Sequence, residues 1–101
     1  MLELYQAEWC PYSHKVRQRL TELGVDYVIR QVEPAREDRE ALREATGQDS
    51  IPAVVLDDGT VLGGEADEII AQLDALLPDG RWAEGHREQA AAHERVRLRP
   101  R

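Results

Sequence analysis

The sequence of 101 residues contains one cysteine, one lysine and no long apolar run. Because Cys10 stands alone, the chain cannot form an internal disulfide or a structural zinc site, and a free thiol favours a reducing setting. No stretch approaches the roughly 20 apolar residues of a membrane-spanning helix, and the N-terminus has no signal-peptide pattern. These absences predict a cytoplasmic protein that does not contact a membrane.

An excess of positive charge is also missing, since 20 acidic residues stand against 13 basic ones and the formal net charge is −7. Nucleic acids require a basic face for their phosphates, so they are not expected as partners. Hydrophobic residues make up 42% of the chain, which is enough for one core. A chain of this length is expected to form a single compact domain.

The composition divides the chain into an expected domain, residues 1–78, and a helical or partly disordered extension, residues 79–101. Six arginines and four acidic residues give the extension a net charge of +2, so residues 1–78 carry −9. Alanines favour a helix from Trp82 to Arg95. We expect Trp82 to anchor this helix to the core and the chain from Arg95 to Arg101 to be frayed.

Hydrophobic periodicity predicts that strands and helices alternate along residues 1–78. Alternating or β-branched runs indicate strands, and apolar residues three and four apart indicate helices. The expected strands are residues 2–6, 26–32, 52–56 and 60–62, and the expected helices begin at Pro11, at Ala35 and after Gly63-Gly64, and end before Gly24, Gly47 and Pro78. The order β-α-β-α-β-β-α favours a parallel first pair, and the Asp58-Gly59 turn adds an antiparallel hairpin. We therefore predict an α/β fold with a mixed four-stranded sheet and helices on both faces.

Cys10 lies directly after the first predicted strand and directly before the first predicted helix. The free amides at a helix N-terminus point at a sulfur in this position, and with the helix dipole they favour the nucleophilic thiolate. An inert buried cysteine is the alternative. Because Pro11 and the polar residues Ser13 and His14 make burial unfavourable, the sequence predicts a reactive thiol.

Three segments resemble motifs of the glutaredoxins. Cys10-Pro11-Tyr12-Ser13 is similar to their active-site motif, with serine for the second cysteine, and residues 46–52 are similar to their Thr-Gly-x-x-Thr-Val-Pro segment. Gly63-Gly64 with Asp67 resembles the glycine pair and acidic residue that close the glutathione site. The resemblance covers residues 1–78 and implies a thioredoxin-like fold. The N-terminal domain of glutathione transferases is a similarly good match, and its Glu-Ser pair aligns with Glu65-Ala66.

The resemblance implies a role for each matching position. Cys10 would be the nucleophile, and Tyr12 would line the groove for the thiol. Ile51 would pair its backbone with the cysteinyl part of glutathione, and Pro52 would be cis. The γ-glutamyl end would lie at a helix N-terminus formed by Gly64, Glu65, Ala66 and Asp67, with Glu65 or Asp67 binding its ammonium. Helix capping and complementarity to the helix dipole explain these two acidic residues equally well.

Two positions depart from the glutaredoxin pattern. Ser13 replaces the resolving thiol, so a redox cycle must pass through a mixed disulfide with another molecule. Ala7 stands where many glutaredoxins have a lysine, and the neighbouring Glu8 adds a negative charge that works against the thiolate. The sequence therefore predicts monothiol chemistry with a less acidic thiol than in the best catalysts.

Several other polar side chains are candidates with simpler explanations. Arg39 or Arg43 could bind the glycyl carboxylate of glutathione, but a solvated face of the helix predicted over residues 35–46 explains both. His14 could approach the sulfur of Cys10, although we expect it to face solvent. His86 and His93 are expected to be surface residues, and no metal site is predicted.

The leading hypothesis is a monothiol glutaredoxin-like thiol–disulfide oxidoreductase that uses Cys10 to reduce mixed disulfides of glutathione or a related small thiol. Its partners would be that thiol and glutathionylated proteins, and a monomer is expected.

Three alternatives stay open. In one, two Cys10 thiolates and two glutathiones hold a [2Fe–2S] cluster in a dimer, although such glutaredoxins usually have Gly-Phe in place of Pro11-Tyr12. In another, the chain is a stand-alone domain like the N-terminal part of a glutathione transferase, because residues 79–101 are too few for the helical domain. The last is an interaction protein that keeps the fold without the chemistry.

Overall fold

The computed structural model describes residues 1–98, with side chains as far as Glu94, and its strands and α-helices follow the predicted order. The strands are β1 (Glu3–Gln6), β2 (Val28–Gln31), β3 (Ala53–Val55) and β4 (Val61–Leu62). The helices are α1 (Pro11–Glu22), α2 (Glu40–Thr46), α3 (Ala66–Leu76) and α4 (Ala83–Leu98), with a short 3-10 helix, η1 (Arg36–Asp38), before α2.

The strands form one mixed sheet in the order β2-β1-β3-β4. β1 and β2 are parallel, as the crossover through α1 requires, and β3 is antiparallel to both β1 and β4. In the hairpin turn between β3 and β4, the amide of Thr60 donates to the Asp58 carboxylate over 2.9 Å. The predicted α/β architecture with a mixed four-stranded sheet is therefore confirmed.

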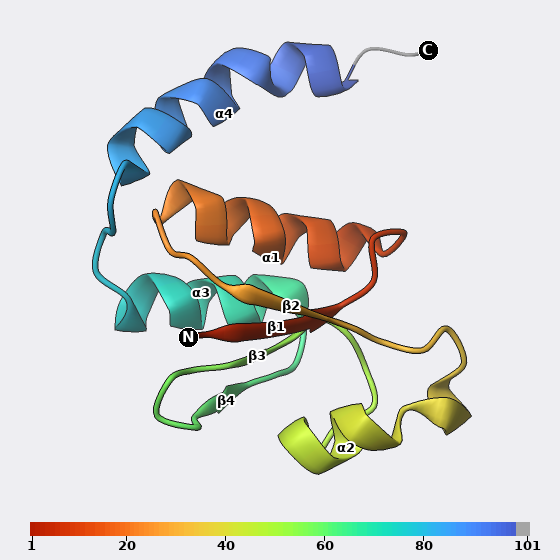
Figure 1. Ribbon diagram of the computed structural model, residues 1–101. Helices are drawn as coiled ribbons and strands as arrows, with labels where there is room; N and C mark the ends of the chain where they lie inside the picture. Colours follow the sequence, from red (N-terminus) through yellow and green to blue (C-terminus); the bar gives the residue numbers. More distant parts are fainter. Residues whose placement is uncertain (99–101) are drawn as a thin grey trace.

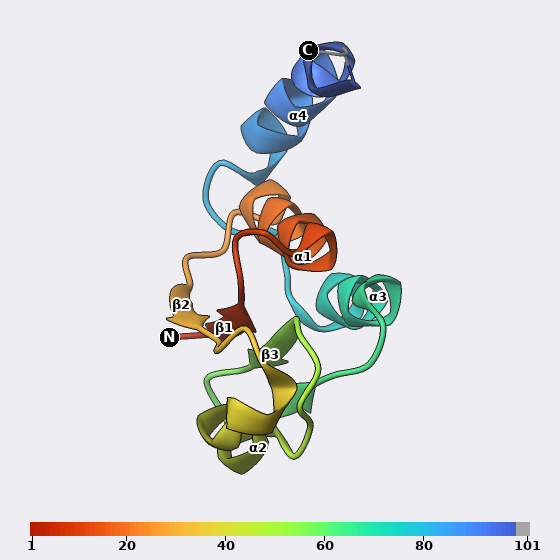
Figure 2. The same ribbon diagram turned by 90° about the vertical axis from the view of Figure 1, so that its right-hand side faces the viewer.

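Helices cover both faces of this sheet (Figure 1, Figure 2). α1 and α3 lie on one face over the larger hydrophobic cluster, which includes Leu4, Val16, Leu20, Val54, Ile69 and Leu73. α2 lies on the opposite face, where Leu42 packs with Val32 and Ala53. Leu4 belongs to the first cluster and its neighbour Tyr5 packs against the second, because successive side chains of a strand point to opposite faces.

The helix predicted over residues 35–46 is instead divided into η1 and α2. The break falls at Arg39, whose φ of −88° and ψ of 50° lie outside the helical region. The predicted solvated position of Arg39 is wrong, since the residue is only 4% exposed. Its guanidinium donates to the carbonyl oxygens of Glu33, Pro34 and Asp49, and these contacts turn the chain where the charge pattern favours a continuous helix.

The extension forms a helix, α4, but the predicted anchor is wrong. Trp82 is 69% exposed and is not part of the core. Ala83 is buried in its place. Arg87 donates to both carboxylate oxygens of Asp79 over 3.0 and 2.9 Å, and to the carbonyl of Glu22 at the end of α1 over 3.0 Å. The helix is therefore held through its first two turns.

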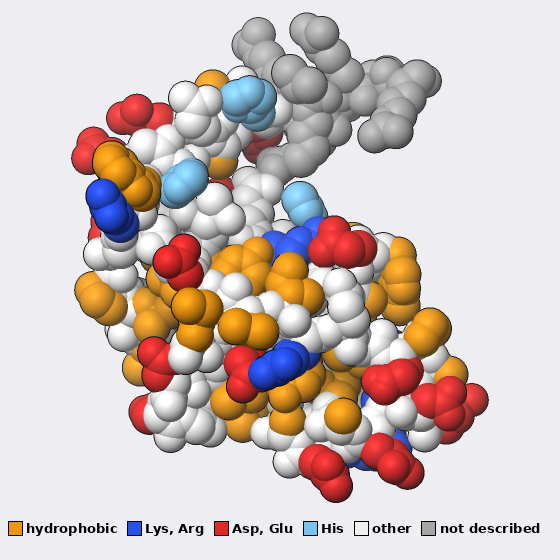
Figure 3. Space-filling model, in the orientation of Figure 1, with side chains coloured by type: hydrophobic (Ala, Val, Ile, Leu, Met, Phe, Trp, Pro, Cys, Tyr) orange, Lys and Arg blue, Asp and Glu red, His pale blue; other side chains and the backbone are white. Residues whose placement is uncertain are grey.

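The remainder of α4 projects beyond α1 (Figure 2). Its backbone is helical as far as Leu98, so the frayed end predicted from Arg95 is wrong for residues 95–98. Residues 99–101, the rest of that prediction, lie outside the described residues. In the described part of the chain, no helix is both long and apolar enough to cross a membrane. On the face shown in Figure 3, acidic side chains are spread widely and basic ones form no continuous patch.

Candidate functional site

Cys10 is the N-cap residue of α1, as its position between strand and helix predicts. Its Sγ accepts a hydrogen bond from the amide of Ser13 over 3.4 Å, and Pro11 begins the helix without losing a needed donor. The backbone amide of Cys10 donates to the carbonyl of Ala7 over 3.1 Å, which fixes the turn from β1. The sulfur therefore lies where the helix dipole and a backbone amide both stabilise negative charge.

The prediction that polar neighbours keep Cys10 away from the interior is wrong. Cys10 is 5% exposed and Ser13 is fully buried. Ser13 is tolerated in the interior because its Oγ accepts a hydrogen bond from the amide of Ala7 over 3.5 Å, and its own amide donates to the sulfur of Cys10. Cys10 nevertheless belongs to neither hydrophobic cluster. Its sulfur has the polar contact that an inert core thiol lacks, and only a narrow approach to it remains.

Two exposed aromatic residues flank this turn in the sequence. Trp9 is 65% exposed and Tyr12 is 57% exposed. Tyr12 comes two residues after Cys10 in the first turn of α1, and its role in lining a groove beside the sulfur stays a prediction. Large exposed aromatic rings are common where a protein binds a ligand.

The second predicted motif precedes β3. The Ile51–Pro52 peptide bond is cis, and Pro52 is buried. Ile51 packs against the α2 cluster of Val32, Leu42 and Ala53. Thr46, which ends α2, accepts the amide of Gln48 over 3.2 Å on its hydroxyl. The turn from α2 into this motif is therefore built from its own polar side chains.

Gln48 belongs to the motif of residues 46–52 and also contacts the Gly63-Gly64 motif, although the sequence predicts no role for it. Its side-chain amide donates to the carbonyl of Ser50 over 2.9 Å. Its Oε1 lies so close to Gly63 that a Cβ there would come within 2.0 Å of it. A larger residue at position 63 would therefore displace the end of the Gln48 side chain, and the glycine at that position is the one sequence signal of this contact.

The third motif forms the start of α3. Gly64 has a φ of +98°, and Glu65 is the N-cap residue with extended backbone. The side chain of Glu65 makes no capping hydrogen bond, so capping by that side chain does not explain the residue. Asp67 is 80% exposed and forms an ion pair of 2.8 Å with Lys15 on α1. Ala66 is buried. The carboxylates of Glu65 and Asp67 are therefore both exposed at the N-terminus of α3.

The ion pair between Lys15 and Asp67 also shows how the motifs are arranged. Lys15 lies five residues after Cys10, so the pair joins the N-terminal part of α1 to the N-terminus of α3. Lys15 is the only lysine in the sequence, and no local pattern connects it with the predicted site. The cysteine turn and the Gly64 turn are therefore on the same side of the helical layer.

The charge of Glu8 is paired in the structure. Nη1 of Arg17 lies 3.5 Å from Oε1 of Glu8 and donates to the buried Gln6. Nη2 of the same guanidinium lies 3.4 Å from Nδ1 of His14. His14 is exposed, as expected. Arg17 therefore offsets the unfavourable acidic residue beside the cysteine turn, a contact that only the packing of α1 on β1 creates.

By sequence, Arg39 and Arg43 are candidate ligands for a glycyl carboxylate, but both guanidinium groups donate to backbone carbonyls instead. Arg39 is buried on three backbone carbonyls, and Arg43 donates to the carbonyls of Arg36 and Glu37. Among the described residues, no group of three or more His, Cys, Asp and Glu side chains could hold a metal ion. With one thiol in the chain, the residues of a single copy do not fit an iron–sulfur cluster, which needs four ligands.

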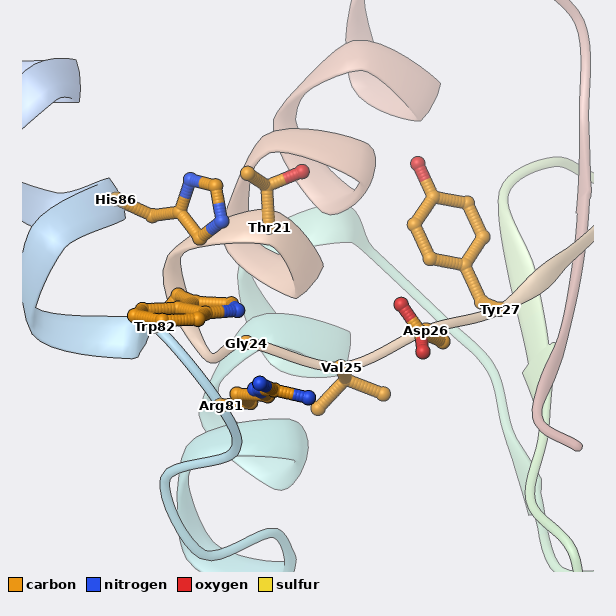
Figure 4. A pocket seen from close by; sticks show the side chains of 8 residues that line it. All are labelled: Thr21, Gly24, Val25, Asp26, Tyr27, Arg81, Trp82 and His86. Atoms are coloured by element: carbon orange, nitrogen blue, oxygen red, sulfur yellow. The ribbon is translucent and has the colours of Figure 1, made fainter.

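A pocket of about 700 Å³ lies at the other end of α1 and contains none of the predicted site residues. Figure 4 shows its lining, in which Trp82 and His86 from the extension face the end of α1 and the segment before β2. The guanidinium of Arg81 lies 5.0 Å from the centre of the Trp82 ring. Burial raises the pKa of Tyr27, another lining residue, although the nearby Arg17 lowers it.

The comparisons with known proteins agree with this arrangement. The family model for glutaredoxin matches residues 2–61. A curated relative, an uncharacterized glutaredoxin-like 8.6 kDa protein in the rubredoxin operon of Clostridium pasteurianum, is 26% identical over 69 residues, which are 68% of this chain and 92% of the relative.

Solved structures show the same fold. A diazinon-metabolizing glutathione S-transferase from the silkworm Bombyx mori has a TM-score of 0.64 and 28% identity, over 75% of this chain and 38% of the transferase. Glutaredoxin 2 from Salmonella typhimurium, solved in complex with glutathione, has a TM-score of 0.63 and 21% identity, over 77% of this chain and 35% of that protein. This chain thus spans little more than a third of either, and the predicted thioredoxin-like fold is confirmed. Because the family match covers more than half of the chain and includes Cys10 and Pro52, the chain belongs to the glutaredoxin family.

Proposed function

We propose that this protein is a monothiol thiol–disulfide oxidoreductase that removes glutathione, or a related small thiol, from mixed disulfides through Cys10. The observation that carries the proposal is the sulfur at the N-terminus of α1, with the amide of Ser13 donating to it. Negative charge on the attacking sulfur is stabilised there. Membership of the glutaredoxin family and the glutathione complex of the Salmonella protein support glutathione as the ligand.

The reaction consists of two thiol–disulfide exchanges. In the first, the Cys10 thiolate attacks the glutathione sulfur of a glutathionylated protein, the old S–S bond breaks, and the protein leaves as a thiolate that takes up a proton. In the second, the thiolate of a free glutathione attacks the glutathione sulfur bound to Cys10, which releases Cys10 and oxidised glutathione. Over both exchanges, the mixed disulfide and one free glutathione thiol become a protein thiol and oxidised glutathione, so the free glutathione supplies the reducing equivalent that the protein sulfur gains.

The single thiol explains why the second exchange needs an external thiol. Ser13 occupies the place of a resolving cysteine and is fully buried, and its oxygen is held by the amide of Ala7. No other sulfhydryl exists in the chain to attack the mixed disulfide on Cys10. The cycle therefore depends on the concentration of the small thiol, as in monothiol exchange generally.

In this proposal, glutathione would be held by the Ile51-Pro52 turn and by the turn at Gly64. The backbone of Ile51, before Pro52, would pair with the cysteinyl part of glutathione. The α-carboxylate of the γ-glutamyl end would bind at the N-terminus of α3, formed by Gly64 and Ala66, where free amides favour an anion. The exposed carboxylates of Glu65 and Asp67 would bind its ammonium, and Tyr12 would border the groove.

The proposal is tested by turnover of a glutathionylated peptide in an assay with glutathione, glutathione reductase and NADPH. The wild-type protein should consume NADPH only with the peptide present, and Cys10→Ser should not. His14→Asn is a matched control, because His14 lies on the same turn of α1 but is exposed and contacts Arg17. Equal rates for wild type and Cys10→Ser, or no turnover by wild type, would reject the proposal.

A glutathione transferase activity is the second candidate, and the 28% identity to the silkworm transferase favours it. Such an enzyme would use the same glutathione site but would transfer the glutathione sulfur to an electrophile. Conjugation of an aromatic halide, followed by its absorbance, would identify this activity. We rank it second because the family model that matches this chain is that of glutaredoxin.

Assembly of a [2Fe–2S] cluster between two copies is ranked below both activities. It would require the two Cys10 thiolates and two external thiols, and Pro11-Tyr12 differs from the Gly-Phe of the cluster carriers that the family resemblance implies. Reconstitution without oxygen followed by gel filtration tests it. A brown dimer would support cluster binding, whereas a colourless monomer would support the oxidoreductase.

A further inference from the structure

We infer that Arg39 is a positioning residue that holds the Ile51-Pro52 turn in place for glutathione. This inference rests on the proposed function, in which the Ile51 backbone pairs with the cysteinyl part of glutathione. It means that part of the affinity for glutathione depends on Arg39, a buried side chain that does not contact the ligand.

The contacts of Arg39 are unusual for a residue in such a charged segment. The residue is 4% exposed, and each of its three guanidinium nitrogens donates to a different backbone carbonyl. Nε donates to Glu33 over 2.8 Å, Nη1 to Asp49 over 2.9 Å and Nη2 to Pro34 over 3.0 Å. No acidic side chain pairs with this guanidinium in the described part of the chain. The side chain is therefore bound to backbone alone.

These carbonyls belong to two segments that are not neighbours in the sequence. Glu33 and Pro34 follow the edge strand β2, whereas Asp49 lies two residues before Ile51. The other hydrogen bonds of the turn connect it mostly to itself, from Gln48 to Ser50 and from Gln48 to Thr46. Arg39 instead ties its backbone to the end of the sheet. Arg36 also contacts the turn, through an exposed ion pair of 3.2 Å with the Asp49 carboxylate, whereas Arg39 is buried and binds the backbone of Asp49.

The shape of arginine suits this arrangement. A guanidinium presents donors in a rigid planar fork, so one side chain can hold three carbonyls at fixed angles, whereas a lysine ammonium is a single donor centre on a flexible chain. The side chain of Ile51 packs against the cluster of Val32, Leu42 and Ala53, and Leu42 belongs to the helix that begins directly after Arg39. The backbone before Ile51 is therefore held by Arg39, and the side chain of Ile51 by a cluster to which α2 contributes.

The three hydrogen bonds that Arg39 donates to backbone, which we call the Arg39 clamp, are separate from the thiol of Cys10. In the structure, the guanidinium of Arg39 makes no hydrogen bond to the cysteine turn, whose sulfur is held by Ser13 on α1. Loss of the clamp should therefore weaken the binding of glutathione and leave the reactivity of Cys10 unchanged. A small displacement of a binding group has large effects when a ligand must pair with it in one geometry.

The experiment compares wild type with Arg39→Met and Arg39→Lys in the assay with the glutathionylated peptide. We expect KM to rise about tenfold in Arg39→Met and less in Arg39→Lys, with kcat within about threefold of wild type. The rate of Cys10 alkylation by iodoacetamide should be unchanged in both variants. If Arg39→Met does not fold, as judged by circular dichroism, Arg39→Lys decides alone.

Arg43→Met is the matched control, because Arg43 also donates to two backbone carbonyls but to those of Arg36 and Glu37 in η1. Its KM should remain that of wild type. A KM within about twofold of wild type in the folded Arg39 variants would overturn the inference, whatever the stability change. Absence of turnover by wild type would instead overturn the proposed function, and binding of S-methylglutathione, measured by calorimetry, would then test Arg39 by itself.

Discussion

The two ends of α1 differ in what the backbone does there. At the first end, the backbone amide of Ser13 donates to the sulfur of Cys10, and Trp9 and Tyr12 are exposed beside it in the sequence. At the other end, the backbone of Leu23 and Gly24 contacts the backbone of Gly80 and Arg81. The amide of Gly80 donates to the carbonyl of Leu23 over 2.7 Å, and a Cβ on Gly24 would lie 2.4 Å from the carbonyl oxygen of Arg81. One helix thus carries a candidate reactive group at its start and the attachment of the extension at its end.

This contrast predicts that activity and stability can be altered separately along one helix. A change at the cysteine end should remove the proposed reacting atom with little loss of packing. A change at the glycine end should remove packing without touching the proposed reacting atom. The following variants test that separation, from the largest expected effect to the smallest.

Replacing Cys10 with serine should give the largest effect. Turnover should fall at least about a thousandfold, because a hydroxyl cannot replace the thiolate nucleophile. Stability should stay within about 1 kcal/mol of wild type, because serine is a good N-cap residue. Urea unfolding and the peptide assay measure the two quantities on the same preparations. A large loss of stability would show that the buried thiol serves mainly in packing.

Replacing Gly24 with alanine should have the opposite result. Its φ of +69° strains any other residue, and the new Cβ would collide with backbone of Gly80 and Arg81. We expect a loss of about 2–3 kcal/mol of unfolding free energy, with activity per folded molecule within about twofold of wild type. Urea unfolding followed by fluorescence measures the stability.

Gly85→Ala is the matched control for this substitution. Gly85 lies in α4, and a Cβ there would meet nothing within 4 Å. Alanine is the better helix former, so this variant should be more stable than wild type by up to about 1 kcal/mol. Equal destabilisation by the two substitutions would contradict the close packing of Gly24 on Gly80.

Replacing Arg87 with methionine tests the side-chain part of the same attachment. Hydrogen bonds from Arg87 lower the pKa of Asp79. A pKa lowered by folding stabilises the protein above the pKa of the unfolded carboxyl, and the effect is lost as pH falls through the folded value. Arg87→Met should therefore be less stable than wild type at pH 7, with a difference that shrinks below about pH 4.

The effect of Arg87→Met should be smaller than that of Gly24→Ala, because both partners of the pair are partly exposed. Urea unfolding of wild type and variant at pH 7 and pH 3 gives the comparison. A difference of the same size at both pH values would show that Arg87 acts through its bond to the Glu22 carbonyl and not through Asp79.

Replacing Lys15 with methionine should have the smallest effect. The ion pair with Asp67 is exposed, so stability should change by less than about 0.5 kcal/mol. The variant frees Asp67 for the ammonium of glutathione, and KM should stay the same or fall up to about twofold. A marked rise in KM would show that Lys15 itself binds the ligand.

Much of the fold follows from local patterns. The alternation in β1, the proline at the start of α1 and the Asp58-Gly59 turn are short-range signals, and each leads to the element that was predicted. The order of elements then leaves few topologies for a mixed sheet. The placement of Cys10 before a helix, and of Gly64 before another, is likewise readable because N-caps and glycine turns depend on neighbouring residues.

The errors lie where a side chain reaches a distant segment. Arg39 looks like one of several surface arginines, but it is buried on carbonyls from two other segments. Ser13 looks polar enough to stay outside, but the backbone amide of Ala7 satisfies its hydroxyl. Trp82 looks like an anchor, but it is exposed, and the extension is attached instead through Ala83 and the close approach of Gly24 to Gly80.

From the sequence alone came the class of fold, the glutaredoxin motifs and the single thiol at a helix start, because these depend on residue identity and on spacing of a few positions. Tertiary structure alone decided the burial of Cys10, the pairing of Glu8 with Arg17, the clamp of Arg39 and the way α4 is held. Each of these depends on how different segments of the chain pack together, and not on the period of one helix or strand. Their partners are chosen by packing, which brings together carbonyls and side chains that no local pattern connects.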